Sequence, residues 1–244
     1  VVAFPHCSNI VAEINPVAAI AERVRAAGAV SVVDGVSYAP HGLPDVSDLG
    51  CDVYLFSSYK TYGPHQGVMV VREELARALP NQGHDFNDAV LKKRVPAGSD
   101  HAQVAALAGV ADYLDDLHAH HFTTNRAADR KGARVRSLMR AHEVALARPL
   151  LDWLSQRNDL RLLGPADPER RAPTVALVHR RPGEELAAGL ARHRVMAGGG
   201  DFYAGRVIRA MGADPDHGVL RLSFVHYTSP AEIERLVAAL DAVL

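Results

Sequence analysis

The chain has 244 residues, enough for one large domain or two modest ones, and its 48% hydrophobic and 23% charged residues are ordinary for a soluble globular protein. A net charge of -1 at pH 7 offers no basic surface for nucleic acid or for an anionic membrane. Only Cys7 and Cys51 are present, too few for a disulfide framework, and no apolar run approaches membrane-spanning length. We therefore expect a reducing, cytoplasmic location without a membrane partner.

The first third of the chain alternates predicted strands and helices. Short apolar runs, typical of buried strands, occur at residues 1–4, 30–33, 52–56 and 68–71. A helix is predicted from Asn15 to Ala27, with Gly28 as its stop, and Asp45 is expected to cap a helical turn that ends at Leu49. Apolar strands that alternate with helices indicate an α/β fold with a mainly parallel sheet, which binds ligands at the carboxyl ends of its strands.

The rest of the chain predicts helices around a smaller α+β region. Helices are expected at His101–Leu117, at Ala127–Leu154 with a break or kink at Pro149, at Glu184–His193 and at Ala231–Leu244. Ser229 and Pro230 form a favourable start for the last helix. Strands are expected at Thr174–Val178 and Gly218–Phe224, and the alternation of the second predicts a half-exposed, antiparallel strand.

Asp34 and Lys60 each follow an apolar run. A lysine in a pocket is costly unless it is paired, neutralised or used covalently. A carboxylate and an amine at the ends of neighbouring buried strands suggest a cofactor site, specifically one for pyridoxal phosphate. Taken alone, Lys60 would be an exposed loop residue and Asp34 a turn or cap residue.

Residues 34–67, DGVSYAPHGLPDVSDLGCDVYLFSSYKTYGPHQG, resemble the cofactor-binding core of the class V aminotransferase family, in its cysteine desulfurase-like group. HCSNIVAEINPV (6–17) and RLSFVHYTSPAEIERL (221–236) resemble two further elements of that family. The resemblance implies the fold of pyridoxal-phosphate-dependent transferases of fold type I. Residues 1–117 would be the C-terminal part of the large domain, and residues 118–244 the small α+β domain.

The resemblance also assigns roles to individual residues. Lys60 matches the lysine that forms a Schiff base with the cofactor, Asp34 the carboxylate at the pyridine nitrogen, and Arg221 the arginine that holds the substrate carboxylate. Five further positions match residues around the cofactor: Ser57 and Tyr59 at its phosphate, Ser37 and Asn9 near its phenolic oxygen, and Ser99 at the phosphate of a neighbouring subunit. The role of Ser99 would imply a homodimer. Arg221 has an alternative interpretation, as a solvated strand residue.

The resemblance implies an enzyme that acts on a small amino acid or amino-acid derivative through the Lys60 Schiff base and an α-carbanion. Cysteine desulfurases carry a nucleophilic cysteine in a small-domain loop, but its counterpart here, residues 197–203, has none. Persulfide transfer is therefore not expected. C–S lyase or aminotransferase activity is expected, and epimerisation stays open. Residues 201–204 and the Tyr59–Lys60 pair are most similar to the subgroup of cysteine desulfurase-like proteins.

Relatives in this family have a longer amino-terminal part, with a phosphate-binding turn and an aromatic residue stacked on the cofactor. We expect that part to be missing from this chain, so the alternative is a truncated or degenerate member without independent catalysis. Gly198–Gly200 is predicted to be a mobile active-site loop. No metal site is expected, and the histidines at 118, 120 and 121 are interpreted as a solvated helix end.

Overall fold

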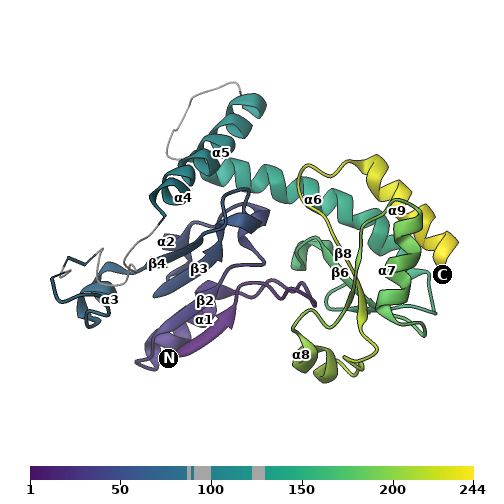
Figure 1. Ribbon diagram of the computed structural model, residues 1–244, viewed down its shortest axis with the longest axis horizontal. Helices are drawn as coiled ribbons and strands as arrows, with labels where there is room; N and C mark the ends of the chain where they lie inside the picture. The colour runs from purple at the N-terminus through teal and green to yellow at the C-terminus, as the bar shows by residue number, and fades with distance from the viewer. Residues whose placement is uncertain (87–88, 91–99, 123–129) are drawn as a thin grey trace. The chain divides into compact units, whose positions relative to one another are not determined.

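The computed structural model describes residues 1–86, 89–90, 100–122 and 130–244 (Figure 1). The chain is α/β, with one four-stranded sheet formed by its first half and another formed by its second half. Within the described ranges, no helix combines the length and the apolar character needed to cross a membrane.

The chain divides into two compact units. Each is built from two segments, the first unit from Val1–His6 and Asn15–Arg136, and the second from Cys7–Ile14 and Ser137–Leu244. The predicted boundary after residue 117 lies instead inside a helix, α5 (Ala108–His121). The segment 7–14 belongs to the second unit because its backbone pairs there: the Ala172 amide donates to the Ala12 carbonyl at 2.9 Å.

The first unit contains a sheet of order β1-β2-β3-β4. Its strands are β1 (Val2–Pro5), β2 (Ser31–Asp34), β3 (Val53–Ser57) and β4 (Gly67–Val71). The first three are parallel and β4 is antiparallel to β3, which confirms the predicted mainly parallel sheet. The carboxyl ends of β1, β2 and β3 therefore lie along one edge, where Asp34 is in register with Pro5 on one side and Leu55 on the other.

Short helices accompany this sheet. They are α1 (Val17–Ala26), α2 (Val46–Leu49), α3 (Glu73–Ala78), α4 (His101–Ala106) and α5. Asp45 caps α2 as predicted, because its side chain accepts from the Ser47 amide. The helix predicted over 101–117 is in fact two helices, α4 and α5, which meet at Leu107. Apolar residues of α1 pack with Val33 and Tyr54 of the sheet.

The second unit contains an antiparallel sheet of order β5-β6-β8-β7. Its strands are β5 (Arg161–Leu163), β6 (Thr174–Val178), β7 (Gly198–Gly200) and β8 (Val219–Ser223). The helices are α6 (Lys131–Ser155), which begins in the first unit, α7 (Gly183–Arg192), α8 (Gly205–Ala210) and α9 (Pro230–Val243). The largest core lies where α6, α7 and α9 pack with β6 and β8. The predicted start of the last helix is confirmed, since Ser229 and Glu232 form a capping box.

The local predictions for Pro149, β8 and Gly198–Gly200 have different outcomes. Pro149 does not break α6, whose flanking Leu146 and Leu150 are buried in the core, and a kink at this residue stays a prediction. β8 is antiparallel and half-exposed as predicted, because Leu220 and Leu222 are buried whereas Arg221 is partly exposed and Ser223 is exposed. Gly198–Gly200 is strand β7 and not a loop: a Cβ on Gly199 would lie 2.2 Å from the Glu184 nitrogen, so glycine permits α7 to approach the strand.

Candidate active site

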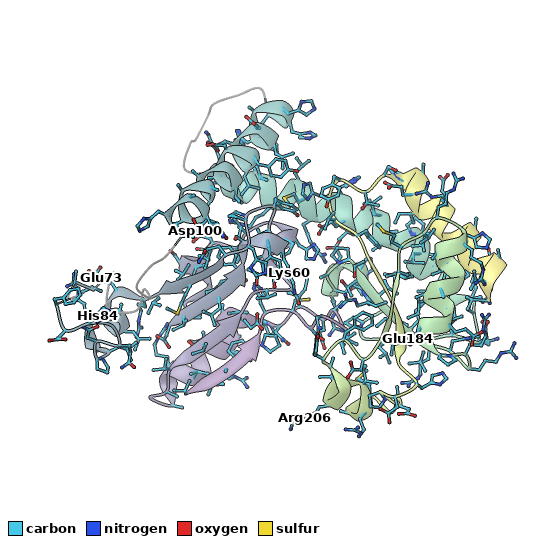
Figure 2. All side chains as sticks on the ribbon, in the orientation of Figure 1. Lys60, Glu73, His84, Asp100, Glu184 and Arg206 are labelled. Atoms are coloured by element: carbon cyan, nitrogen blue, oxygen red, sulfur yellow. The ribbon has the colours of Figure 1, made fainter. Side chains whose placement is uncertain are left out.

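Lys60 lies just beyond the carboxyl end of β3, in a one-turn 3-10 helix, η2 (Ser58–Lys60), and is labelled in Figure 2. The turn is fixed by hydrogen bonds: the Ser58 hydroxyl donates to the Gln66 carbonyl at 2.8 Å, and the Thr61 hydroxyl to the Ser57 carbonyl at 3.0 Å. The Lys60 side chain is exposed, and its Nζ lies 6.0 Å from the centroid of the Tyr59 ring. Among the described residues, no carboxylate pairs with this amine. Hydrogen bonds thus hold the turn that carries Lys60, and its amine has no carboxylate partner in the described part of the chain.

Asp34 is the last residue of β2, at the same edge of the sheet. Its Oδ1 accepts from the Val36 amide at 2.9 Å, whereas its Oδ2 has no donor within the described part of the chain. Its carbonyl accepts from the His6 amide at 2.7 Å, so the strand end is tied to β1. The side chain is exposed and one carboxylate oxygen remains available for a ligand.

Three hydroxyl residues are close to Asp34 and Lys60 in the sequence: Ser37 follows Asp34, and Ser57 and Tyr59 precede Lys60. Ser57 ends β3, and Ser37 lies in the turn that follows Asp34. Tyr59 is 47% exposed, and its ring stacks on that of His65 with centroids 4.6 Å apart. The Tyr59 hydroxyl has no acceptor among the residues that the structure describes, so it is free to donate to an anion.

His6 belongs to this edge of the sheet and was not singled out from the sequence. It follows β1 directly, is buried, and stacks on Tyr38 with ring centroids 3.7 Å apart. Its Nδ1 lies 2.9 Å from the Tyr54 hydroxyl. Burial lowers the pKa of His6 to about 4, so the ring is neutral at pH 7. Its position after an apolar run, like that of Asp34, is the signal by which it could have been found.

We expect His6 to make the folded protein sensitive to acid. Because its folded pKa of about 4 lies below the ordinary 6.5, the unfolded chain takes up the proton first, and stability falls as the pH drops from 6.5 toward 4. Wild type should lose about 2 kcal/mol more unfolding free energy than His6→Asn between pH 7 and pH 4.5. Denaturant titrations at both pH values measure this difference, and equal losses in the two proteins would contradict the assignment.

Arg221 and Asn9 lie in the second unit. Arg221 is in β8, and its Nη1 donates to the Asn9 carbonyl at 3.3 Å. Its guanidinium carbon lies 4.0 Å from the centroid of the Phe202 ring, and the Asn9 side-chain amide donates to the Phe202 carbonyl at 3.0 Å. Burial lowers the pKa of Arg221 from its usual value. Arg221 is therefore a partly buried, anchored cation and not a solvated strand residue, and Phe202 is a contact that the sequence did not reveal.

The predicted site residues are thus divided between the units. The first unit contains Asp34, Ser37, Ser57, Tyr59 and Lys60, and the second contains Asn9 and Arg221, which are in contact. Ser99 lies outside the described residues. The role of each residue toward a cofactor or substrate stays a prediction.

The family model described as Aminotransferase class-V matches residues 1–236 of the chain. The chain belongs to the class V aminotransferase family. This family and its cysteine desulfurases depend on pyridoxal phosphate.

The relatives include both an aminotransferase-like protein and cysteine desulfurases. The aminotransferase-like protein FGM3 of Gibberella zeae is 30% identical over 250 residues, which cover 100% of this chain and 59% of that protein. A probable cysteine desulfurase of Pseudomonas putida is 28% identical over 255 residues, covering 99% of this chain and 58% of the relative. The chain therefore spans less than two thirds of the length of these class V relatives.

Solved structures confirm the predicted fold. The apo structure of a cysteine desulfurase from Thermococcus onnurineus NA1 matches with a TM-score of 0.81 and 22% identity, over 99% of this chain and 59% of that chain. The cysteine desulfurase CsdA from Escherichia coli gives a TM-score of 0.80 at 22% identity, over 99% of this chain and 58% of that chain. Both likenesses support the fold of pyridoxal-phosphate-dependent transferases of fold type I.

Both cysteines are buried free thiols. Burial raises the pKa of Cys7 to about 12, and its thiol donates to the Ala12 carbonyl at 3.3 Å. Burial also raises the pKa of Cys51. Because the thiolate is the reactive form, neither residue has the character of a sulfur-accepting nucleophile.

The predicted solvated histidine cluster needs a correction. His118 is buried and stacks on Phe122 with centroids 5.0 Å apart, because its face of α5 is covered, whereas His120 and His121 are exposed. In the described ranges, no group of three or more histidine, cysteine or acidic side chains could hold a metal ion.

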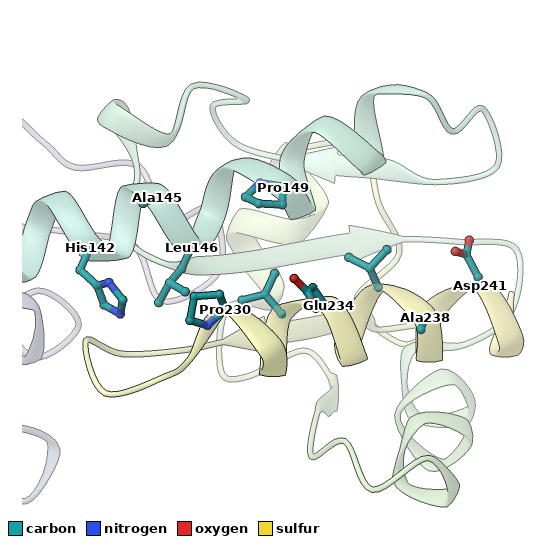
Figure 3. A pocket seen from close by; sticks show the side chains of 10 residues that line it. His142, Ala145, Leu146, Pro149, Pro230, Glu234, Ala238 and Asp241 are labelled. Carbon is teal, nitrogen blue, oxygen red and sulfur yellow. The ribbon is translucent and has the colours of Figure 1, made fainter.

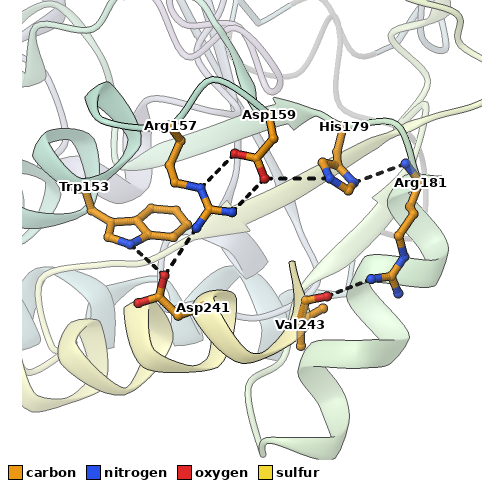
Figure 4. Close-up of polar contacts among 7 residues, drawn as sticks. All are labelled: Trp153, Arg157, Asp159, His179, Arg181, Asp241 and Val243. Atoms are coloured by element: carbon orange, nitrogen blue, oxygen red, sulfur yellow. Dashed lines mark hydrogen bonds and ion pairs between the residues drawn. The ribbon is translucent and has the colours of Figure 1, made fainter.

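Two other features of the second unit take no part in the predicted site. An apolar groove of about 460 Å³ lies between α6 and α9, and no predicted site residue lines it (Figure 3). A polar network fixes the end of α9: Arg157 binds Asp159 through two contacts of 2.6 and 2.8 Å and reaches Asp241 at 3.4 Å (Figure 4). We interpret this network as structural support for the small sheet.

Proposed function

We propose that the protein is a pyridoxal-phosphate-dependent enzyme that acts on an amino acid or amino-acid derivative by removing its α-proton. One observation carries this proposal: an unpaired amine, Lys60, and a carboxylate with an available oxygen, Asp34, stand at the carboxyl ends of adjacent parallel strands. Ligands of open α/β sheets bind at this edge.

The residues of the first unit fit the cofactor by their chemistry. Pyridoxal phosphate supplies an aldehyde that bonds to amines and a ring that accepts the electron pair left when the α-proton departs. The Asp34 carboxylate would keep the pyridine nitrogen protonated. The Lys60 Nζ would hold the aldehyde and, once released by the substrate amine, would take the α-proton. The hydroxyls of Ser57 and Tyr59 would donate hydrogen bonds to the phosphate, and Ser37 would lie near the phenolic oxygen of the cofactor.

Arg221 would bind the substrate carboxylate. A guanidinium offers a planar pair of donors that matches the two oxygens of a carboxylate, and Arg221 has no acidic partner among the described residues. The backbone carbonyl of Asn9 supports this arginine, and the Asn9 side chain keeps its proposed place near the phenolic oxygen of the cofactor.

The reaction that we favour is C–S lyase or aminotransferase chemistry, with epimerisation as a further outcome of the same α-carbanion. Persulfide transfer is disfavoured because both thiols are buried and protonated. We further propose a cytoplasmic homodimer, with Ser99 reaching the phosphate of the neighbouring subunit.

The alternative is that this part of the family fold has no catalytic activity of its own. This alternative is supported by the chain covering only 59% of the length of FGM3. Proton exchange separates the two. With pyridoxal phosphate in D2O, the chain should exchange the α-proton of alanine and cysteine, followed by proton NMR. Cysteamine, which has the amine and thiol of cysteine but no carboxylate, should exchange at least about tenfold more slowly if Arg221 binds that group. Absence of exchange from both amino acids would contradict the enzymatic proposal. If exchange is observed, assays for sulfide, pyruvate and amino-group transfer identify the reaction.

A further inference from the structure

We propose that Phe202 is a positioning residue for Arg221, and that it leaves the Nε–Nη2 edge of the guanidinium as the carboxylate-binding edge. This inference rests on the role of Arg221 in the proposed function. It adds a residue, Phe202, and a direction of approach for the substrate.

The stacking contact is built into the small sheet. Gly198 of β7 is the register partner of Arg221 in β8. A Cβ on Gly198 would lie 2.8 Å from the Phe202 ring, so the glycine leaves the space that the ring occupies. The ring then lies 4.0 Å from the guanidinium carbon, within the range of a cation–π contact. Glycine at 198 is therefore a requirement of the stack.

The backbone that directs the ring is strained and held by polar contacts. Phe202 and Tyr203 both have positive φ, 52° and 59°, a left-handed conformation that is unfavourable for residues other than glycine. The Asp201 carboxylate accepts from the Tyr203 amide at 3.2 Å, and Asn9 donates to the Phe202 carbonyl at 3.0 Å. Strain that is held in this manner is concentrated at ligand-binding sites.

The contacts of Arg221 leave one of its edges available. Phe202 covers a face of the guanidinium, and Nη1 donates to the Asn9 carbonyl. Within the described part of the chain, nothing accepts from Nε or Nη2. Those two donors form a planar fork that matches a carboxylate, whereas the Nη1–Nη2 edge is already partly used. The substrate carboxylate would therefore bind side-on at Nε and Nη2.

The Nε–H proton of Arg221 reports on both parts of the proposal in the full chain. In wild type its NMR signal should be shifted upfield by the Phe202 ring and should move further when sodium propionate is added as a carboxylate probe. Arg221→Lys identifies the signal by removing it. Phe202→Leu should abolish the ring shift and weaken propionate binding on the order of tenfold, because the cation is no longer held in place. Phe202→Tyr should retain both.

Tyr203→Leu is the matched control, since Tyr203 has the same backbone conformation but a fully exposed ring. It should leave the Arg221 signal unchanged, and Phe202→Tyr keeps the test valid if the leucine variant does not fold. An unshifted wild-type signal would overturn the stack. A shifted signal that does not respond to propionate would overturn the side-on edge. Normal shifts and propionate binding without α-proton exchange would support this inference while the proposed catalysis fails.

Discussion

Lys60→Ala is expected to abolish covalent attachment of pyridoxal phosphate and to lower turnover by about 10³-fold or more. The reason is that Lys60 supplies both the amine that holds the aldehyde and the base that takes the α-proton. Nothing else on the described sheet edge offers an unpaired primary amine next to Asp34. Visible absorbance after addition of the cofactor measures the attachment, and the α-proton exchange assay measures turnover.

Lys131→Ala is the matched control for this experiment. Lys131 is also in the first unit, but its amine pairs with the Asp115 carboxylate at 3.4 Å on the surface. Such exposed pairs contribute about 0–1 kcal/mol to stability, so this variant should retain the absorbance band and the turnover. A band that survives in Lys60→Ala, or that is lost in Lys131→Ala, would remove Lys60 from its proposed role.

Gly35→Ala is expected to destabilise the first unit by about 3 kcal/mol, because it overpacks a closed core. A Cβ at this position would fall 2.2 Å from the Tyr54 ring, which is fully buried. The backbone cannot move aside easily: the Gly35 amide donates to the Leu55 carbonyl at 2.7 Å, and its own carbonyl accepts from two amides of the following turn. Asp34 precedes this glycine, so cofactor binding should weaken as well.

Gly109→Ala is expected to have the opposite effect on the stability of the same unit. Gly109 lies in α5, and a Cβ there meets nothing within 4 Å. Alanine should therefore stabilise the helix by up to about 1 kcal/mol. Denaturant unfolding of both variants measures the pair, and a Gly35→Ala protein as stable as wild type would show that Tyr54 is not held as described.

The sequence predicted the large sheet well because its signals are local. Apolar runs, the helix from Asn15 and the Asp45 cap each depend on neighbours in the chain, and all three appear in the structure. The positions of Asp34 and Lys60 at strand ends follow from the same runs and from the parallel order of β2 and β3. That order is what turns two separate residues into one candidate site.

The features that the sequence did not predict depend on partners distant in the chain. Gly198–Gly200 looks like a loop until α7 and β8 pack against it. The Phe202–Arg221 stack requires the pairing of β7 with β8, and Asn9 reaches both because residues 7–14 join the second unit. Burial of His6 likewise requires Tyr38 and Tyr54. Periodicity and spacing carry no information about such contacts.

Mapping the attachment point of the cofactor tests the central claim most directly. The sequence has four lysines, Lys60, Lys92, Lys93 and Lys131, so borohydride reduction with one equivalent of pyridoxal phosphate, followed by peptide mass spectrometry, can identify the modified residue. The proposed site predicts modification at Lys60, lost when Asp34→Ala weakens binding. Modification spread over the other lysines, or none at Lys60, would contradict it.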